Sequence, residues 1–275
     1  MAPDVFAFVP WVLAALLGLV VGSFLNVVIH RLPLMMEREW QATQDLPETP
    51  DTHFNLAVPG SHCPQCDHPL HGFDNIPVLS FLLLRGRCRH CQAAIAWQYP
   101  AVELATAAIF VWSFSRYGLS ADALAWAGFA AALLALAVID AGTTLLPDAI
   151  TQPLTWAGLL AAALGVIAVP LNDALWGAVA GYLFLWAIYW LFRLLTGKEG
   201  MGHGDFKLLA ALGAWFGWQA LIALVMIASL SGMVVGLWLK WRQRLPEGGY
   251  IPFGPFLALA GAVQMVWGTS AWLSW

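Results

Sequence analysis

The chain contains 275 residues, of which 60% are hydrophobic and only 10% are charged, and its formal net charge is −4. A soluble domain carries roughly 25% charged residues, so this composition excludes an ordinary soluble protein and predicts an all-α polytopic membrane protein. The net charge itself says little about partners; we expect a lipid bilayer and no nucleic acid around the chain. No oligomeric state follows from it.

The first apolar stretch, residues 6–29, is long enough to cross a membrane, because about 20 residues span the hydrocarbon core. No basic residue precedes it and no small-residue cleavage pattern follows, so we interpret it as a retained helix and not a signal peptide. We expect Pro33 to end this helix. Further apolar stretches, which bring the expected number of crossings to about eight, are at residues 100–117, 121–139, 151–169, 174–195, 206–217, 219–240 and 254–273.

Prolines, histidines, charges and all four cysteines gather between the first and second predicted helices. We therefore expect a first transmembrane helix (1–30), a cytoplasmic loop module (31–98) and a transmembrane domain (99–275). With the module in the cytoplasm, alternating crossings leave only Arg116 among the basic residues on the far side. This agrees with the excess of Lys and Arg in cytoplasmic loops.

Cys63, Cys66, Cys88 and Cys91 form two C-x-x-C pairs. Two such pairs complete a tetrahedral four-thiolate site, for which Zn²⁺ is the expected occupant, with a structural role because no coordination position stays open. The alternatives are two disulfides, which a reducing cytoplasm disfavours, and four free thiols, which the specific pairing of two C-x-x-C motifs makes less expected. Four histidines offer replacement ligands, although solvated loop side chains are the simpler interpretation; they are His62, His68, His71 and His90.

Asp140 ends one predicted helix and Asp205 opens another, so both are expected at the cytoplasmic boundary. Ionisable groups in a membrane domain are costly and indicate function. Two adjacent carboxylates share a proton, so that one activates a water and the other protonates the substrate carbonyl. We therefore predict an aspartyl protease dyad, with Gly202 and Gly204 giving a substrate strand close access to the backbone.

Other interpretations of the acidic residues remain open at this point. Asp205 is also a plausible helix N-cap, and Asp148 is both an N-cap and a second candidate for the place of Asp140. Lys207 either neutralises the dyad or extends to the interface. Glu103 is expected in the first turn of the second helix, where an acid is favourable. Gly86 suits a turn with positive φ.

Six strings carry a resemblance to a known family: GSFLNVVIHRLP, CPQC with DNIPVLSFLLLRGRCRHC, YPAVE, IDAGTTLLPDAIT, GHGDFKLLAALGAWFG and PFGPFLALAG. In this order they closely resemble the bacterial type IV prepilin peptidases, membrane aspartic proteases of the GxGD kind. The resemblance implies cleavage of prepilin and pseudopilin leaders at the cytoplasmic face of the inner membrane. It also implies N-methylation of the new terminal residue, commonly Phe, with S-adenosylmethionine.

The resemblance also assigns residues. Asp140 and Asp205 match the catalytic pair, the four cysteines match the cytoplasmic cysteine motif, and Gly86 in RGRC matches the glycine needed for methylation. Family members often have a further acid where this chain has Gly142. No G-x-G-x-x-G is present, so the sequence does not indicate where the methyl donor binds.

Two rival functions follow from the same residues. A polytopic transporter would use Asp140 and Asp205 as a proton relay. An assembly scaffold would use the cysteine module to dock a partner. Neither rival needs a peptide substrate that is cleaved.

Overall fold

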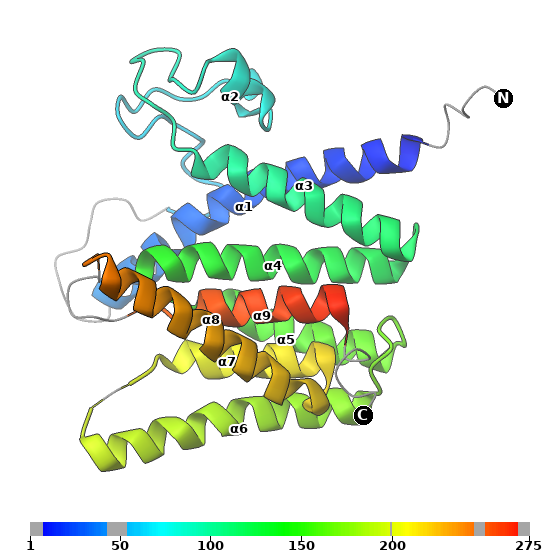
Figure 1. The fold of residues 1–275 in the computed structure, drawn as a ribbon. Coiled ribbons are helices and arrows are strands. Elements are labelled where there is room, and N and C mark those ends of the chain that lie inside the picture. Colours follow the sequence, from blue (N-terminus) through cyan, green and yellow to red (C-terminus); the bar gives the residue numbers. More distant parts are fainter. Residues whose placement is uncertain (1–7, 43–53, 199, 245–250, 269–275) are drawn as a thin grey trace. The chain divides into compact units, whose positions relative to one another are not determined.

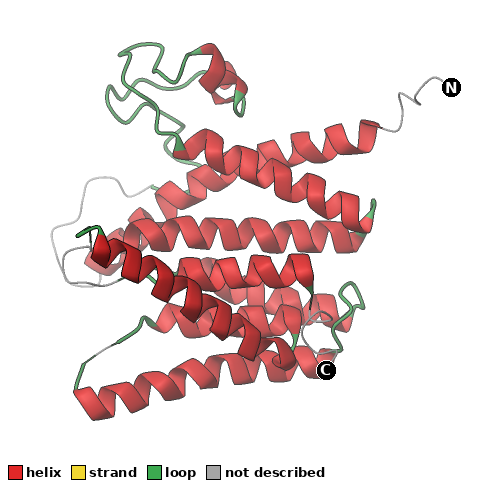
Figure 2. Cartoon of the chain, viewed as in Figure 1, coloured by secondary structure: helices red, strands yellow, loops and turns green. Residues whose placement is uncertain are grey.

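The computed structural model describes residues 8–42, 54–198, 200–244 and 251–268. Within these ranges the chain forms helices joined by loops, with no β-strand (Figure 2). The α-helices are α1 (Val9–Ala42), α2 (Leu79–Leu83), α3 (Gln98–Tyr117), α4 (Ala121–Thr143), α5 (Asp148–Ala163), α6 (Leu171–Thr196), α7 (His203–Phe216), α8 (Leu221–Trp241) and α9 (Gly254–Trp267). The chain divides into two compact units, residues 1–131 and 132–275. The predicted boundaries at residues 30 and 98 stay predictions.

Four described helices are long and apolar enough to cross a membrane: α1, α4, α6, and α8 with the short turn before it. Helices α7 and α9 each contain 14 residues. Such a helix is about 21 Å long, less than the roughly 30 Å of a hydrocarbon core. The all-helical prediction is therefore confirmed, whereas the count of about eight crossings stays a prediction.

Helices α1 and α3 pack closely in the first unit because two glycines of α1 lack side chains. A Cβ atom on Gly18 would lie 2.6 Å from Cα of Ala107, and one on Gly22 would lie 2.7 Å from Cα of Glu103. Small residues at an interface allow membrane helices to approach in this way. Beside this contact lies an apolar cluster of Ala14, Phe110, Phe114, Ala123, Ala127 and Ala131.

The expectation that Pro33 ends the first helix is wrong, because α1 continues to Ala42. Proline removes one amide donor and kinks a helix, but the flanking residues keep their own hydrogen bonds. Buried Arg31 also ties this turn to the following loop by donating to carbonyl oxygens of Asn55 at 3.0 Å and Gly60 at 3.4 Å. The helix therefore continues through Pro33 to Ala42, and Arg31 connects the turn before the proline to residues 55–60.

Helix α7 is the centre of the second unit and contacts α5, α6, α8 and α9 (Figure 1). Eleven of its 14 residues are buried, so it belongs to the bundle interior. Gly213 of α7 and Gly177 of α6 meet back to back, and a Cβ on either would overlap the other's backbone. On the opposite side Trp215 Nε1 donates to the carbonyl oxygen of Leu154 at 2.8 Å. These contacts fix the helix that begins beside Asp205.

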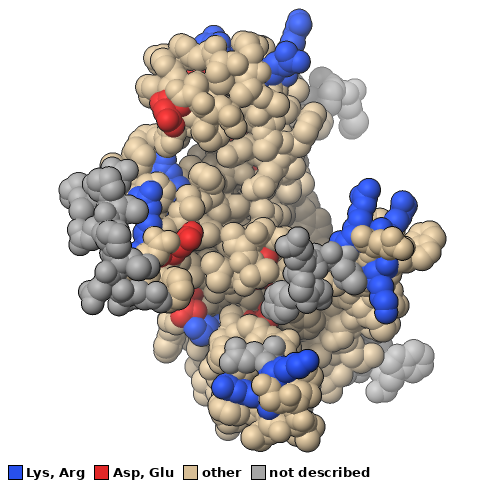
Figure 3. All heavy atoms as spheres, turned by 90° about the vertical axis from the view of Figure 1, so that its left-hand side faces the viewer, with Lys and Arg blue, Asp and Glu red and all other residues tan. Residues whose placement is uncertain are grey.

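Large apolar side chains remain exposed on α6 and α8, among them Leu191 and Ile222. On the face shown in Figure 3, Lys, Arg, Asp and Glu are scattered over a surface of mostly uncharged residues. Extended exposed apolar surface of this kind marks a lipid or protein interface. Together with the four long apolar helices it identifies a membrane protein.

Candidate active site and metal centre

The two C-x-x-C pairs form two turns of the same design. The amide of Cys63 donates to the carbonyl oxygen of His68 at 3.0 Å, and the amide of Cys88 donates to that of Ala93 at 2.8 Å. Each turn thus brings two thiols to one side of a short backbone loop. We call these two turns, residues 63–66 and 88–91, the knuckles.

The four cysteine Sγ atoms lie within 4.8 Å of one another, and those of Cys63 and Cys91 are 3.8 Å apart. A tetrahedral ion with metal–sulfur bonds of about 2.3 Å requires sulfur separations of about 3.8 Å. All four thiols are free, so the disulfide alternative is not formed. The cluster fits one tetrahedral metal ion bound by four thiolates.

Gly86 adopts φ +68°, as its interpretation as a turn residue requires. A Cβ there would lie 3.0 Å from Cζ of Phe81, whose ring packs against Trp97 with centroids 4.9 Å apart. A side chain at position 86 would therefore strain the turn and displace an aromatic pair next to the second knuckle.

Glu103 is placed differently from its prediction. Because α3 begins at Gln98, Glu103 lies in the second turn and not the first, and it is buried. Its Oε2 accepts a hydrogen bond of 2.7 Å from the amide of Val78, and the Ser23 hydroxyl also bonds this carboxylate. The carboxylate joins the loop between the knuckles to α1 and α3. The signal in the sequence was an acid inside an apolar helix.

Asp140 and Asp205 lie in the same region of the second unit. Asp140 lies in the last turn of α4, Asp205 lies in the first turn of α7, and both are buried. Oδ2 of Asp140 accepts a 2.9 Å hydrogen bond from the amide of Gly254 at the start of α9. Asp205 is not the N-cap, because Gly202 holds that position.

Leu146, on the loop after α4, packs between two glycines of this region. A Cβ on Gly204 would lie 2.6 Å from Cβ of Leu146, and a Cβ on Gly254 would lie 3.1 Å from its Cδ1. Gly204 is thus explained by helix-to-loop packing. Access for a substrate strand, the reason expected from the sequence, stays a prediction.

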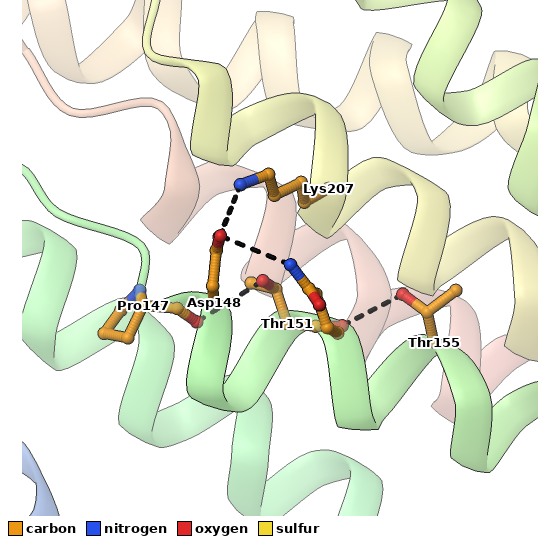
Figure 4. A network of polar contacts seen from close by, with 6 residues as sticks. Pro147, Asp148, Thr151, Thr155 and Lys207 are labelled. Atoms are coloured by element: carbon orange, nitrogen blue, oxygen red, sulfur yellow. Dashed lines mark hydrogen bonds and ion pairs between the residues drawn. The ribbon is translucent and has the colours of Figure 1, made fainter.

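Asp148 has a different environment from Asp140. Lys207 Nζ lies 2.6 Å from both of its carboxylate oxygens, and Gln152 Nε2 donates to Oδ2 at 3.3 Å (Figure 4). The Asp148 side chain is 50% exposed. Pro147 is the N-cap of α5, so Asp148 does not hold that position. Sequence spacing left Asp140 and Asp148 as equal candidates; the structure buries Asp140 and leaves Asp148 half-exposed and paired with Lys207, and the choice of Asp140 stays a prediction.

Two family models match the chain in succession. The bacterial peptidase A24 N-terminal domain matches residues 16–117, and the type IV leader peptidase family matches residues 127–237. The first range contains the cysteine cluster, and the second contains both buried aspartates. No solved structure matches the chain significantly.

Curated relatives resemble the chain over nearly its whole length. A prepilin leader peptidase/N-methyltransferase of Burkholderia pseudomallei (strain 1026b) is 52% identical over 94% of this chain and 86% of the relative. Proteins of the same name from Aeromonas salmonicida (strain A449) and Stutzerimonas stutzeri are 52% and 50% identical, over 95% and 93% of this chain and 93% and 90% of those relatives. The chain therefore belongs to the type IV leader peptidase family.

Proposed function

We propose that this protein removes the leader peptide of type IV prepilins as an aspartic endopeptidase and then N-methylates the new amino terminus. The observation that supports the peptidase half is that two buried aspartates, Asp140 and Asp205, lie within the segment matched by the peptidase family, beside Gly254 and Gly204, which both pack against Leu146. The methyltransferase half rests on the names of relatives about 50% identical over most of the chain.

The dyad supplies all the groups that peptide hydrolysis needs. With one proton shared, the ionised carboxylate takes a proton from water while the protonated carboxyl gives its proton to the scissile carbonyl oxygen. The tetrahedral intermediate then collapses: the peptide C–N bond breaks, the amine leaves with a proton from one aspartic acid, and a hydroxyl of the intermediate returns its proton to the other aspartate, which restores the shared proton. Burial of both side chains strengthens each electrostatic interaction in this sequence.

The substrate in this proposal is a prepilin or a type II secretion pseudopilin whose apolar helix stays in the inner membrane and whose basic leader lies in the cytoplasm. The active site then faces the cytoplasm, at the depth where α4 ends and α7 begins. The acidic run 37–51 would attract a basic leader, although solvated loop charge is an equally simple interpretation. Residues 43–51 of that run lie outside the described residues.

We assign Zn²⁺ to Cys63, Cys66, Cys88 and Cys91, because a hard metal such as Mg²⁺ does not favour four thiolates. The ion would cross-link the two turns and has no open coordination position, so its role is structural. Gly86 beside the second knuckle is our candidate for the methyl-transfer half, with S-adenosylmethionine as donor. Its positive φ and its contact with Phe81 exclude a side chain there.

The direct test is incubation of the purified full-length protein with a prepilin in detergent. We expect loss of a leader-sized fragment and, after addition of S-adenosylmethionine, a product heavier by one methyl group. A transporter with an aspartate proton relay would show no dependence on a peptide. A scaffold would bind the prepilin and leave it intact. Either of these two results would contradict the proposal.

A further inference from the structure

We propose that Gly254, at the start of α9, is a positioning residue of the dyad. Its amide hydrogen-bonds Oδ2 of Asp140, and its missing side chain leaves room for that carboxylate. This inference rests on the proposed function, because it concerns the geometry of the same two aspartates. It adds a third segment, 114 residues beyond Asp140, to the active site.

Both the hydrogen bond and the close packing depend on Gly254. The distance from the Gly254 nitrogen to Oδ2 of Asp140 is 2.9 Å, and the hydrogen bond is buried. A Cβ atom on Gly254 would lie 2.5 Å from Oδ2 and 3.0 Å from Cγ of Asp140. Real Cβ atoms do not approach an oxygen so closely, so with any other residue at position 254 either the carboxylate or the start of α9 must shift, and both movements disturb the hydrogen bond.

The local sequence explains why an amide is free to make this bond. The first amides of a helix have no partner within it, and Gly254 is the first residue of α9. Pro255 follows it and has no amide to compete. The Gly254 amide at the start of α9 is therefore available as a donor, and Asp140 accepts its hydrogen bond.

The bond also restricts where the shared proton of the dyad can be. An amide hydrogen bond stabilises negative charge on the oxygen that accepts it, so a proton on Asp140 is favoured on Oδ1 over Oδ2. Gly254 thereby holds Asp140 in position and biases where its proton resides. A shift of about 1 Å in such a group lowers turnover by about 100-fold.

The test compares kcat and KM for prepilin cleavage by purified full-length variants. For Gly254→Ala we expect kcat to fall by about 100-fold with KM changed by less than about threefold, because the substrate contacts are not altered. Gly261→Ala is the matched control on the same helix. Its Cβ would meet side-chain atoms of Leu212 at 2.7 Å and Leu133 at 2.9 Å, and no carboxylate.

A second pair of variants separates the two neighbours of Gly254. Leu146→Ala removes the Cδ1 atom that the new methyl group of Gly254→Ala would crowd, but leaves Asp140 in place. We expect Leu146→Ala/Gly254→Ala to remain about 100-fold below Leu146→Ala in kcat. This comparison also serves if Gly254→Ala alone does not fold, which thermal unfolding would show.

An inactive Asp140→Asn variant would show that the proposed function holds. In that case, three results would overturn the inference about Gly254. The first is a wild-type kcat in Gly254→Ala, the second is an equal loss of kcat in Gly261→Ala, and the third is a kcat in Leu146→Ala/Gly254→Ala equal to that of Leu146→Ala. If Asp140→Asn itself cleaved normally, the proposed function would fail first. The two failures are therefore distinguishable in one set of assays.

Discussion

Lys207 and Asp148 form an ion pair between residues 59 positions apart, with the ammonium nitrogen 2.6 Å from both carboxylate oxygens. The pair joins Lys207, the fifth residue of α7, to Asp148, the first residue of α5. The two acids of the motif IDAGTTLLPDAIT therefore have different environments. Asp148 is paired with a cation and half-exposed to solvent, whereas Asp140 is buried and accepts a hydrogen bond from Gly254.

Asp148→Asn is therefore expected to keep prepilin cleavage within about tenfold of wild type and to lower the free energy of unfolding by less than about 1 kcal/mol, since exposed ion pairs contribute little. The charge-swapped variant Asp148→Lys/Lys207→Asp should recover part of any loss. Cleavage assays and thermal unfolding measure both effects. A complete loss of cleavage in Asp148→Asn would mean that Asp148, and not only Asp140, belongs to the catalytic machinery.

The cysteine cluster predicts one zinc ion per chain in metal analysis of the purified protein. Cys66→Ser and Cys88→Ser should lose that ion, because a four-thiolate site has no spare ligand. Chelation should make the loop around the knuckles more sensitive to protease, since binding energy for such a site is folding energy. His71→Ala is the control and should retain zinc. Metal-free protein with four titratable thiols would remove the assignment.

Glu103 is expected to hold the loop between the knuckles through the Val78 amide. Glu103→Ala leaves that amide without its acceptor, which costs about 1–3 kcal/mol for a buried group. Hydrogen exchange at the Val78 amide should accelerate in this variant. Glu103→Gln keeps a carbonyl oxygen in the same place and should preserve most of the protection. Equal exchange in wild type and Glu103→Ala would show that the contact does not hold the loop.

Much of the fold was predictable because apolar runs mark membrane helices directly. The runs predicted at 100–117 and 121–139 correspond to α3 (Gln98–Tyr117) and α4 (Ala121–Thr143). The clustering of the four cysteines was also predictable, since two C-x-x-C pairs indicate a local geometry. Pro33 was misjudged because its effect depends on tertiary contacts of Arg31 that no local rule contains.

The parts of the site that sequence could not supply are all long-range. Asp140 and Asp148 have similar local patterns, and they are distinguished by distant segments: Gly254 of α9 at Asp140 and Lys207 of α7 at Asp148. Gly254 lies in the sequence PFGPFLALAG, and nothing in that sequence predicts a hydrogen bond to Asp140, 114 positions earlier. Glu103 looked like a favourable helix-start acid, whereas its partner is a backbone amide in another segment.

The most direct test of the account is the rate of prepilin cleavage by the single variants Asp140→Asn and Asp205→Asn. Asparagine keeps the size of each side chain but can neither share a proton with its partner nor act as a base. We predict that each variant folds and that each lowers kcat by at least about 1,000-fold. Cleavage at the wild-type rate by either variant would contradict the aspartyl dyad.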